Sequence, residues 1–302
     1  MMKVTLTNEI LSYIIEIEHN RYKVSSVKLS KPVMNRLRKN SKKKSSYASN
    51  KIEGNPLSEK QVDEVIERDE RKHYLKPEQE VRNYFLALNY LEEKVSKKEK
   101  FSQKLILDVQ KLVEKGASKE KIGLRGSMPP GVLFAVYDSK TGNPDYIPPE
   151  YCDIPELLDE LVEYVNTTDD HPLIVAAVVH YQLVTIHPFE DGNGRTARLL
   201  SGYIMDLNGY GFNGIGSLEE YFAYDIDEYY ESIQMGLPAL YYSGRENPPH
   251  PEIWINYFLR MVKLYSGKVC DLQLASEEED IAGSLSFLKG KAVSYTHLRA
   301  HE

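Results

Sequence analysis

Residues 172–205, PLIVAAVVHYQLVTIHPFEDGNGRTARLLSGYIM, decide how this chain folds and carry most of its recognisable chemistry. The run up to Ile186 is almost wholly apolar, which predicts a helix that is buried on every side. Because Pro188 cannot continue that helix, we expect it to end at His187. After a short glycine-rich loop, helical periodicity resumes near Arg195. The stretch therefore predicts a helix, a loop and a second helix.

The loop between these two helices has the composition of an anion-binding site. Gly192 and Gly194 can adopt positive φ angles, so that successive backbone N–H groups point into one concavity. A helix N-terminus directly behind such a concavity favours a phosphate group. A glycine-rich loop by itself is more often an ordinary turn, and neither GxxxxGK[ST] nor HExxH occurs in the sequence. The P-loop and zincin classes are therefore without support.

Four side chains around the loop have the chemistry that phosphoryl or nucleotidyl transfer requires. Asp191 offers a hard oxygen ligand for Mg²⁺. Arg195 and Arg198 lie three residues apart, hence on one helical face, and can bind phosphate oxygens. His187 can accept a proton from an attacking hydroxyl at neutral pH. Taken singly, the histidine could be structural and the arginines a solvated pair; together within twelve residues, they predict one site.

Two other residues of the stretch are expected to be structural. Phe189 is expected in the core whether or not the loop binds phosphate. His180 lies two turns before His187 on the same helical face, and we interpret it as a buried structural histidine rather than a metal ligand.

Outside this stretch the apolar pattern is helical almost everywhere, which predicts an all-α, mainly helical protein. Strand character is confined to residues 132–148, where VLFAVYD and DYIPP flank SKTGNP and predict one β-hairpin. The expected helical segments are 10–17, 33–37, 62–65, 84–91, 105–113, 157–165, 173–186, 199–207 and 253–264.

The composition is that of an ordinary soluble globular protein, with 41% apolar and 27% charged residues. The N-terminal apolar run is too short for a secretory signal or a membrane span, so we expect no membrane association and a cytoplasmic location. The two cysteines form no metal-binding or disulfide pattern. The net charge is −7, yet residues 20–52 hold eleven Lys or Arg and no acidic residue. Such a segment could contact nucleic acid, although a solvated surface is its commoner meaning.

The segment HPFEDGNGRTAR, residues 187–198, resembles the signature HPFx[D/E]GNGRxxR of the Fic family at every fixed position. The resemblance implies a mainly helical Fic fold with the hairpin as a flap, and a protein adenylyltransferase that uses ATP with Mg²⁺. Phosphotransferase relatives of the Doc type carry Lys where this chain has Gly194, which favours AMP transfer over phosphate transfer. The implied roles are a base at His187, a core anchor at Phe189, an Mg²⁺ ligand at Asp191, a phosphate-binding turn at Gly192, Asn193 and Gly194, and contacts to the distal phosphates from Arg195 and Arg198.

A second resemblance lies in the N-terminal region, where Ser49-Asn50-Lys51-Ile52-Glu53-Gly54 is similar to the family's inhibitory motif [S/T]xxxE[G/N]. It implies regulatory roles for Ser49, Glu53 and Gly54, with Glu53 pairing with Arg198 and displacing the γ-phosphate of ATP. The other interpretation is a surface glutamate at a helix end, with Gly54 as the first residue beyond the helix. Because an arginine held by a carboxylate cannot bind phosphate at full strength, we expect little activity in the unmodified chain.

Three more segments resemble parts of the family's site. The hairpin 132–148 corresponds to the flap on which a hydroxyl of a target protein is docked by edge-strand pairing. Gly123-Leu124-Arg125 resembles the segment with a glycine and an arginine that precedes the flap. Tyr229 and Tyr230 resemble the tyrosine pair on the adenine side of the nucleotide, although tyrosines at this spacing are nearly as often core or surface residues.

The chain is expected to fold as one body with an arm and a C-terminal extension. Burial of the apolar helix at 10–17 could need a second copy of the chain, so a homodimer is one expectation. The predicted regions are an N-terminal helical arm with the inhibitory motif (1–57), a Fic catalytic core (58–265), a C-terminal segment that could begin a truncated winged-helix module (266–291) and a tail that resembles a cloning artefact (292–302).

The leading hypothesis is transfer of AMP from ATP to a Tyr, Ser or Thr hydroxyl of a target protein, autoinhibited by Glu53. The same residues could transfer UMP or GMP, or remove AMP with Glu53 orienting a water. An alternative from another class is a nucleotide-sensing or DNA-binding regulator, which the basic arm and SLSFLKGK at 284–291 suggest.

Overall fold

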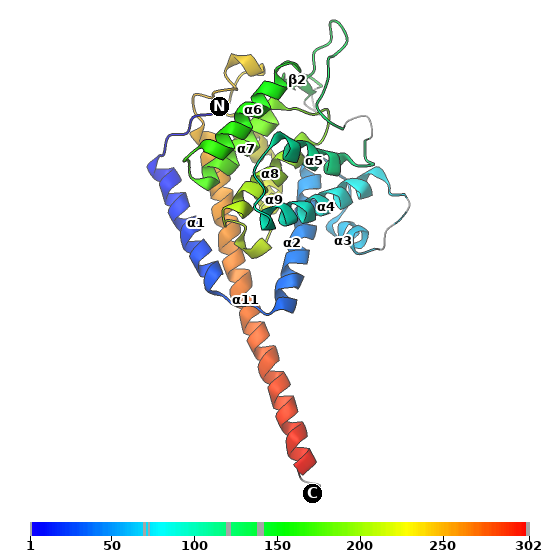
Figure 1. Cartoon of the computed structure of the whole chain (residues 1–302), viewed down its shortest axis with the longest axis vertical. Coiled ribbons are helices and arrows are strands. Elements are labelled where there is room, and N and C mark those ends of the chain that lie inside the picture. Colours follow the sequence, from blue (N-terminus) through cyan, green and yellow to red (C-terminus); the bar gives the residue numbers. More distant parts are fainter. Residues whose placement is uncertain (1, 69–70, 72, 119–121, 138–141, 300–302) are drawn as a thin grey trace.

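The computed structural model describes residues 2–68, 71, 73–118, 122–137 and 142–299, with side chains described no further than residue 280. This part of the chain is mainly helical, as the apolar periodicity predicts, and its sheet is a two-stranded hairpin (Figure 1). The helices and strands are α1 (Asn8–Ser26), α2 (Lys31–Ile52), α3 (Glu59–Glu67), α4 (Lys76–Ser96), α5 (Gln103–Glu114), β1 (Val136–Tyr137), β2 (Pro144–Tyr146), α6 (Ile154–Thr167), α7 (Pro172–Ile186), α8 (Asn193–Leu207), η2 (Phe212–Gly214), α9 (Glu219–Tyr224), α10 (Ile226–Gln234), η3 (Tyr241–Ser243) and α11 (Glu252–Arg299).

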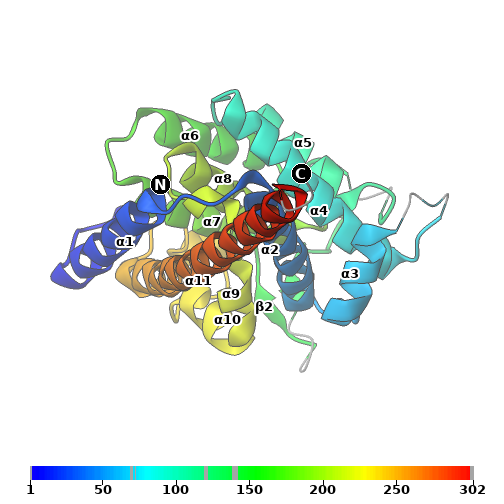
Figure 2. The same cartoon turned by 90° about the horizontal axis from the view of Figure 1, so that it is seen from below.

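The centre of the fold is α7, which lies with α8 in the middle of the helices (Figure 2). α8 packs along it, and α6 and α11 cover other sides. A helix that is apolar all round is stable only when other elements surround it. Trp254 of α11 is fully buried and donates its indole N–H to the carbonyl of Ala177, 2.8 Å away. The helix that leads to His187 is therefore fixed inside the molecule.

Helix α1 lies along α11 (Figure 1). Its apolar residues Ile10, Ile14 and Ile17 are buried there. The amide of Asn20 donates to the hydroxyl of Ser266 at 2.9 Å. A helix from the other end of the same chain therefore covers one apolar face of α1. The homodimer stays a prediction, and other apolar residues of this helix stay exposed: Leu11 at 41% and Ile15 at 68%.

Helix α11 is the longest element and extends well beyond the rest of the molecule (Figure 1). Where α11 extends beyond the other helices, the Asp280 carboxylate accepts two hydrogen bonds from Ser30, the N-cap residue of α2. The donors are the backbone N–H at 2.8 Å and the hydroxyl at 3.0 Å. α11 is continuous through the predicted boundaries after residues 265 and 291, so the division of this region stays a prediction. Neither α11 nor any other helix in the described ranges is apolar enough over sufficient length to cross a membrane.

The predicted hairpin is present. β1 and β2 are antiparallel, with Val136 opposite Tyr146. Residues 138–141 of the predicted hairpin lie outside the described residues. The hydroxyl of buried Tyr146 donates to the carbonyl of Thr185 in α7. The base of the hairpin is therefore attached to the helix that ends at the predicted site.

Basic residues of α2 face carboxylates of neighbouring helices. The side chain of Lys43 is largely buried, with Nζ 2.8 Å from the carboxylate of Glu67. Nζ of Lys44 lies 3.1 Å from the carboxylate of Glu220. Charge that is paired within the chain is less available to phosphates of a nucleic acid. The basic arm therefore contributes to packing of α2 against α3 and α9.

Candidate active site

His187 is the C-cap residue of α7 and has left-handed backbone angles, φ 49° and ψ 58°. Such angles cost on the order of 1–3 kcal/mol in a residue other than glycine and concentrate at functional sites. The N–H of His187 still donates to the carbonyl of Leu183 at 3.1 Å. Nε of Arg125 donates to the carbonyl of His187 at 2.9 Å, and the N–H of Arg125 donates to the carbonyl of Pro188 at 2.9 Å. The arginine before the hairpin thus fixes the backbone at His187.

The imidazole of His187 is placed as a neutral base. Its Nδ1 lies 3.3 Å from the carbonyl of Val184, and its ring centroid is 6.0 Å from that of Phe134. A proton on Nδ1, where it can donate to that carbonyl, leaves the lone pair of Nε2 to accept another. Burial lowers the pKa of His187 to about 4, against the smaller opposing effect of the Val184 carbonyl. The side chain is therefore uncharged at neutral pH.

This lowered pKa gives a prediction for the resting protein. We expect the ring resonances of His187 to stay constant from about pH 8 to about pH 5.5, because the folded protein takes up this proton only as the pH approaches about 4. NMR of the histidine-labelled chain measures the chemical shifts of these ring resonances against pH. The His187 signal is assigned as the one that is lost in the His187→Asn variant. A titration midpoint near the usual value of about 6.5 would contradict this lowering of the pKa of His187.

The loop after His187 is braced by Asn193, the first residue of α8. Its Oδ1 accepts the N–H of Phe189 at 3.0 Å, and its Nδ2 donates to the carbonyl of Phe189 at 2.9 Å. Phe189 itself is buried, as expected of a core anchor. Gly192 has φ 81°, a conformation that favours glycine. The side chain of Asn193 therefore holds the loop from within, and the N-terminus of α8 is the end that favours an anion.

Asp191 lies at the edge of the loop, with its side chain 27% exposed. Its Oδ1 accepts from the N–H of Gly192 at 2.8 Å and from Nη2 of Arg195 at 3.2 Å. One carboxylate here fits Mg²⁺, which proteins usually hold through one or two carboxylates together with water and substrate phosphates. Among the described residues no group of three or more His, Cys, Asp or Glu side chains could hold a metal. A cation held by Asp191 would take its other ligands from water and from the phosphates of a bound nucleotide.

The guanidinium of Arg198 is buried and surrounded by acceptors. Nε donates to the hydroxyl of Ser49 at 2.8 Å, and Nη2 donates to the carbonyl of Ser49 at 3.0 Å. Nη2 also donates to Oε1 of Glu53 at 2.6 Å, and Nη1 donates to the hydroxyl oxygen of Tyr229 at 3.3 Å. Burial alone would lower the pKa of Arg198, but the Glu53 carboxylate holds it above its usual range. The structure thus brings Glu53 to Arg198, as the resemblance to the inhibitory motif implies, and adds Ser49 as a further acceptor for Arg198.

Glu53 reaches the point where α8 begins. It is the C-cap residue of α2, and Gly54 follows with φ 79°, as expected of a glycine just beyond a helix. A Cβ on Gly194 would overlap Oε1 of Glu53, so the carboxylate lies against the backbone of the loop. Glu53 therefore places a negative charge at the helix end that favours one.

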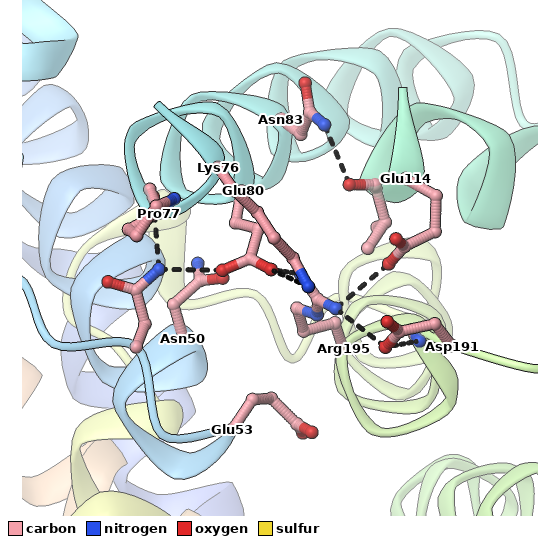
Figure 3. A network of polar contacts seen from close by, with 12 residues as sticks. Asn50, Glu53, Lys76, Pro77, Glu80, Asn83, Glu114, Asp191 and Arg195 are labelled. Carbon is pink, nitrogen blue, oxygen red and sulfur yellow. Dashed lines mark hydrogen bonds and ion pairs between the residues drawn. The ribbon is translucent and has the colours of Figure 1, made fainter. Parts of the chain in front are cut away.

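Arg195 contacts carboxylates of α4 and α5 (Figure 3). Its Nη2 is 2.9 Å from Oε1 of Glu114, and its Nη1 is 3.8 Å from Oε1 of Glu80. The other oxygen of Glu80 accepts from Nδ2 of Asn55 at 2.9 Å. The sequence did not point to Glu80 or Glu114, because neither belongs to a motif and a helical glutamate usually faces solvent. The two arginines of α8 are thus held by different carboxylates.

Tyr229 and Tyr230 of α10 differ in exposure. Tyr229 is buried, and its hydroxyl lies 2.8 Å from Nε2 of the fully buried His180. Tyr230 is 42% exposed, with its hydroxyl 3.4 Å from the carbonyl of Ile52. His180 is therefore a buried structural histidine, as expected. Of the two tyrosines, Tyr230 is the one that a ligand could contact, and a role for the pair at adenine stays a prediction.

A neutral base beside a helix N-terminus, with two arginines, defines a site suited to transfer of a phosphorus group. The model of the Fic/DOC family matches residues 57–205, which include the whole loop. This part of the chain is a Fic domain, as the resemblance of HPFEDGNGRTAR predicts.

The chain is similar to curated protein adenylyltransferases. It is 46% identical to protein adenylyltransferase fic-1 of Caenorhabditis elegans over 67 residues, 21% of this chain and 13% of that protein. It is 28% identical to protein adenylyltransferase Fic of Drosophila virilis over 206 residues, 65% of this chain and 39% of that protein. The chain thus spans less than half the length of these relatives. A Fic family protein from Desulfovibrio desulfuricans G20 has the same fold, with a TM-score of 0.72 at 22% identity over 89% of this chain and 76% of that one.

Proposed function

We propose that this chain is a protein adenylyltransferase that transfers AMP from ATP to hydroxyl side chains of other proteins. The observation that carries the proposal is His187, a half-buried neutral base beside the N-terminus of α8. Gly194 in place of the lysine of Doc-type relatives favours AMP over phosphate as the transferred group. The similarity to curated protein adenylyltransferases supports the same activity.

The proposed reaction is a single in-line displacement. The hydroxyl oxygen attacks the α-phosphorus of ATP, the bond to the pyrophosphate oxygen breaks, and Nε2 of His187 takes the hydroxyl proton. The N-terminus of α8 and Arg195, with Arg198 once it is released, stabilise the negative charge on the phosphate oxygens. Asp191 is the side chain that would hold Mg²⁺, which when bound neutralises part of that charge. The products are the AMP-modified protein and pyrophosphate.

We propose that the target docks on the hairpin with a Tyr, Ser or Thr hydroxyl directed toward His187. In the described part of the chain the sheet consists of β1 and β2, so an extended segment could add to it by backbone pairing. Leu133 and Tyr137 are exposed at 62% and 58%, and they offer apolar contact to such a segment. Between them in sequence, Phe134 approaches the ring of His187. A strand docked here would pass close to the base.

We also propose that Glu53 keeps the resting chain nearly inactive. While Nη2 of Arg198 donates to Glu53, it is not available to the γ-phosphate. The same carboxylate lies against Gly194, at the end of α8 that would otherwise face phosphate. ATP would then bind in a geometry unsuited to in-line attack.

Intact mass spectrometry tests the proposed activity. We expect the Glu53→Gly chain, incubated with Mg²⁺ and ATP, to add the mass of one AMP to itself or to a protein of a cell lysate, and to add less nucleotide from GTP, UTP or CTP. Omission of the divalent cation with a chelator is the control. Addition of a phosphate mass would contradict AMP transfer. Loss of AMP from a pre-modified protein with the unmodified chain, but not with Glu53→Gly, would favour the de-AMPylating alternative.

A further inference from the structure

Glu114 is a buried carboxylate that the loop motif does not include. It is the last residue of α5, its side chain is 0% exposed, and its Oε1 lies 2.9 Å from Nη2 of Arg195 (Figure 3). Its second oxygen, Oε2, has no hydrogen-bond partner among the described residues. Because an unpaired charge at this depth is strongly unfavourable, Glu114 and Arg195 depend on each other.

Helix α4 fixes the backbone that carries Glu114. Nδ2 of Asn83 donates to the carbonyls of Val113 and Lys115, the residues on either side of Glu114, both at 2.8 Å. Oδ1 of Asn83 accepts from Nε2 of Gln79 at 2.8 Å, which fixes the orientation of the Asn83 amide. Glu114 is thus aimed by residues outside the motif.

The glycine loop rests directly on Glu114. A Cβ on Gly192 would lie 2.6 Å from Oε1 of Glu114 and 3.3 Å from Cγ1 of Val113. Position 192 therefore needs glycine for two reasons, its positive φ and the close approach of this carboxylate. Glu114 therefore lies against both Arg195 of α8 and the backbone of the loop at Gly192.

Glu114 also affects whether the Asp191 carboxylate can bind a cation while Arg195 stays in place. Both carboxylates approach the same Nη2 of Arg195, Glu114 at 2.9 Å and Asp191 at 3.2 Å. When Asp191 turns toward a cation, Arg195 keeps a close carboxylate partner and stays in place. Without Glu114, the nearest remaining partner is Asp191, since Glu80 is 3.8 Å from Nη1. Arg195 and the cation would then compete for Asp191.

We propose that Glu114 is a positioning residue for nucleotide transfer: it holds Nη2 of Arg195, so that Asp191 is available to Mg²⁺ and the other N–H groups of Arg195 are available to phosphate. This inference rests on the proposed function. Nε and Nη1 of Arg195 have no hydrogen-bond partner among the described residues, although the residue is only 3% exposed. Buried donors are nearly always satisfied, so two such donors in one side chain point to a ligand.

The test uses the Glu53→Gly background, in which Arg198 is released. Glu114→Gln keeps a hydrogen-bond acceptor for Arg195 but removes the charge, and Glu114→Ala removes both. At fixed ATP we expect the Mg²⁺ concentration for half-maximal transfer to rise about threefold in the Gln variant and about tenfold in the Ala variant, the scale of a lost charge-assisted hydrogen bond. Calorimetry with ATP and Mg²⁺ should show Kd rising in the same order.

These readouts separate positioning from a merely structural role. A loss of folded protein would lower the apparent kcat, but it would leave the Mg²⁺ dependence and the Kd of the remaining molecules unchanged. Asp108→Asn is the matched control, because Asp108 is a carboxylate of the same helix that binds Lys104 and Tyr90 away from the loop. We expect no shift in that variant.

Each outcome decides between the two proposals. Unchanged Mg²⁺ dependence and Kd in folded Glu114→Ala, or in Glu114→Gln if the Ala variant does not fold, would overturn the role of Glu114 and leave the proposed function intact. ATP binding that depends on Glu114 without any transfer by Glu53→Gly would overturn the proposed function and support the role of Glu114. No ATP binding by Glu53→Gly would overturn both.

Discussion

Replacement of His187 by Asn is expected to lower AMP transfer at least about a hundredfold in the Glu53→Gly background, because a general base contributes roughly 10²–10⁴-fold. Asn is the preferred replacement since position 187 has φ 49°, a left-handed conformation that Asn tolerates well. Transfer of label from [α-³²P]ATP to protein measures the effect.

Nucleotide binding should survive this substitution. The described hydrogen bond of the imidazole is a 3.3 Å contact to the Val184 carbonyl, so we expect the Kd for ATP to change by no more than about threefold. His250→Asn is the matched control, because the side chain of His250 is 71% exposed. AMP transfer at the full rate by a folded His187→Asn protein would show that His187 is not the general base.

Replacement of Glu53 by Gly is expected to raise label transfer at least about tenfold. It removes the 2.6 Å contact to Arg198, and a hydrogen bond between charged groups is worth about 1.5–3 kcal/mol, less where solvent reaches it. Arg198 stays oriented, because Nε still donates to the hydroxyl of Ser49 and Nη2 to its carbonyl. The released edge of the guanidinium can then bind phosphate.

Two further variants make this test specific. Glu53→Gln keeps the length of the side chain but removes its charge. We therefore expect an amount of label transfer that lies between the amounts for the unmodified chain and for Glu53→Gly. Ser49→Ala removes one acceptor from Arg198 but leaves Glu53, so we expect little activation. Equal transfer by the unmodified chain and by Glu53→Gly would show that Glu53 does not restrain the site.

The parts of the site that the sequence predicted are those in which chemistry is concentrated in one short segment. His187 to Arg198 could be interpreted together because twelve consecutive residues supply base, loop and arginines. Glu53 was found through its own short motif, although it lies 145 residues before its partner. Glu114 belongs to neither motif. Nothing in its local pattern distinguishes a buried carboxylate from a solvated one, and only the packing of α5 under the loop shows the difference.

The position of α11 on α1 could not be predicted for a similar reason. The apolar spacing of Ile10, Ile14 and Ile17 correctly predicts an amphipathic helix. It does not say which surface covers that helix, because a second copy and a distant helix of the same chain would leave the same pattern. The covering helix, α11, begins more than two hundred residues later.

Helix α2 is attached at both ends by side chains that come from far along the chain. Ser30 at its start is bound by Asp280, and Ser49 near its end binds Arg198 through both its hydroxyl and its carbonyl. Glu53 lies beyond that second attachment, with its side chain 31% exposed. The carboxylate can therefore swing into water by rotation about its own bonds while the helix stays docked. The site would then open by rotation of the Glu53 side chain and not by movement of α2. It could close again on the timescale of a side-chain rotation.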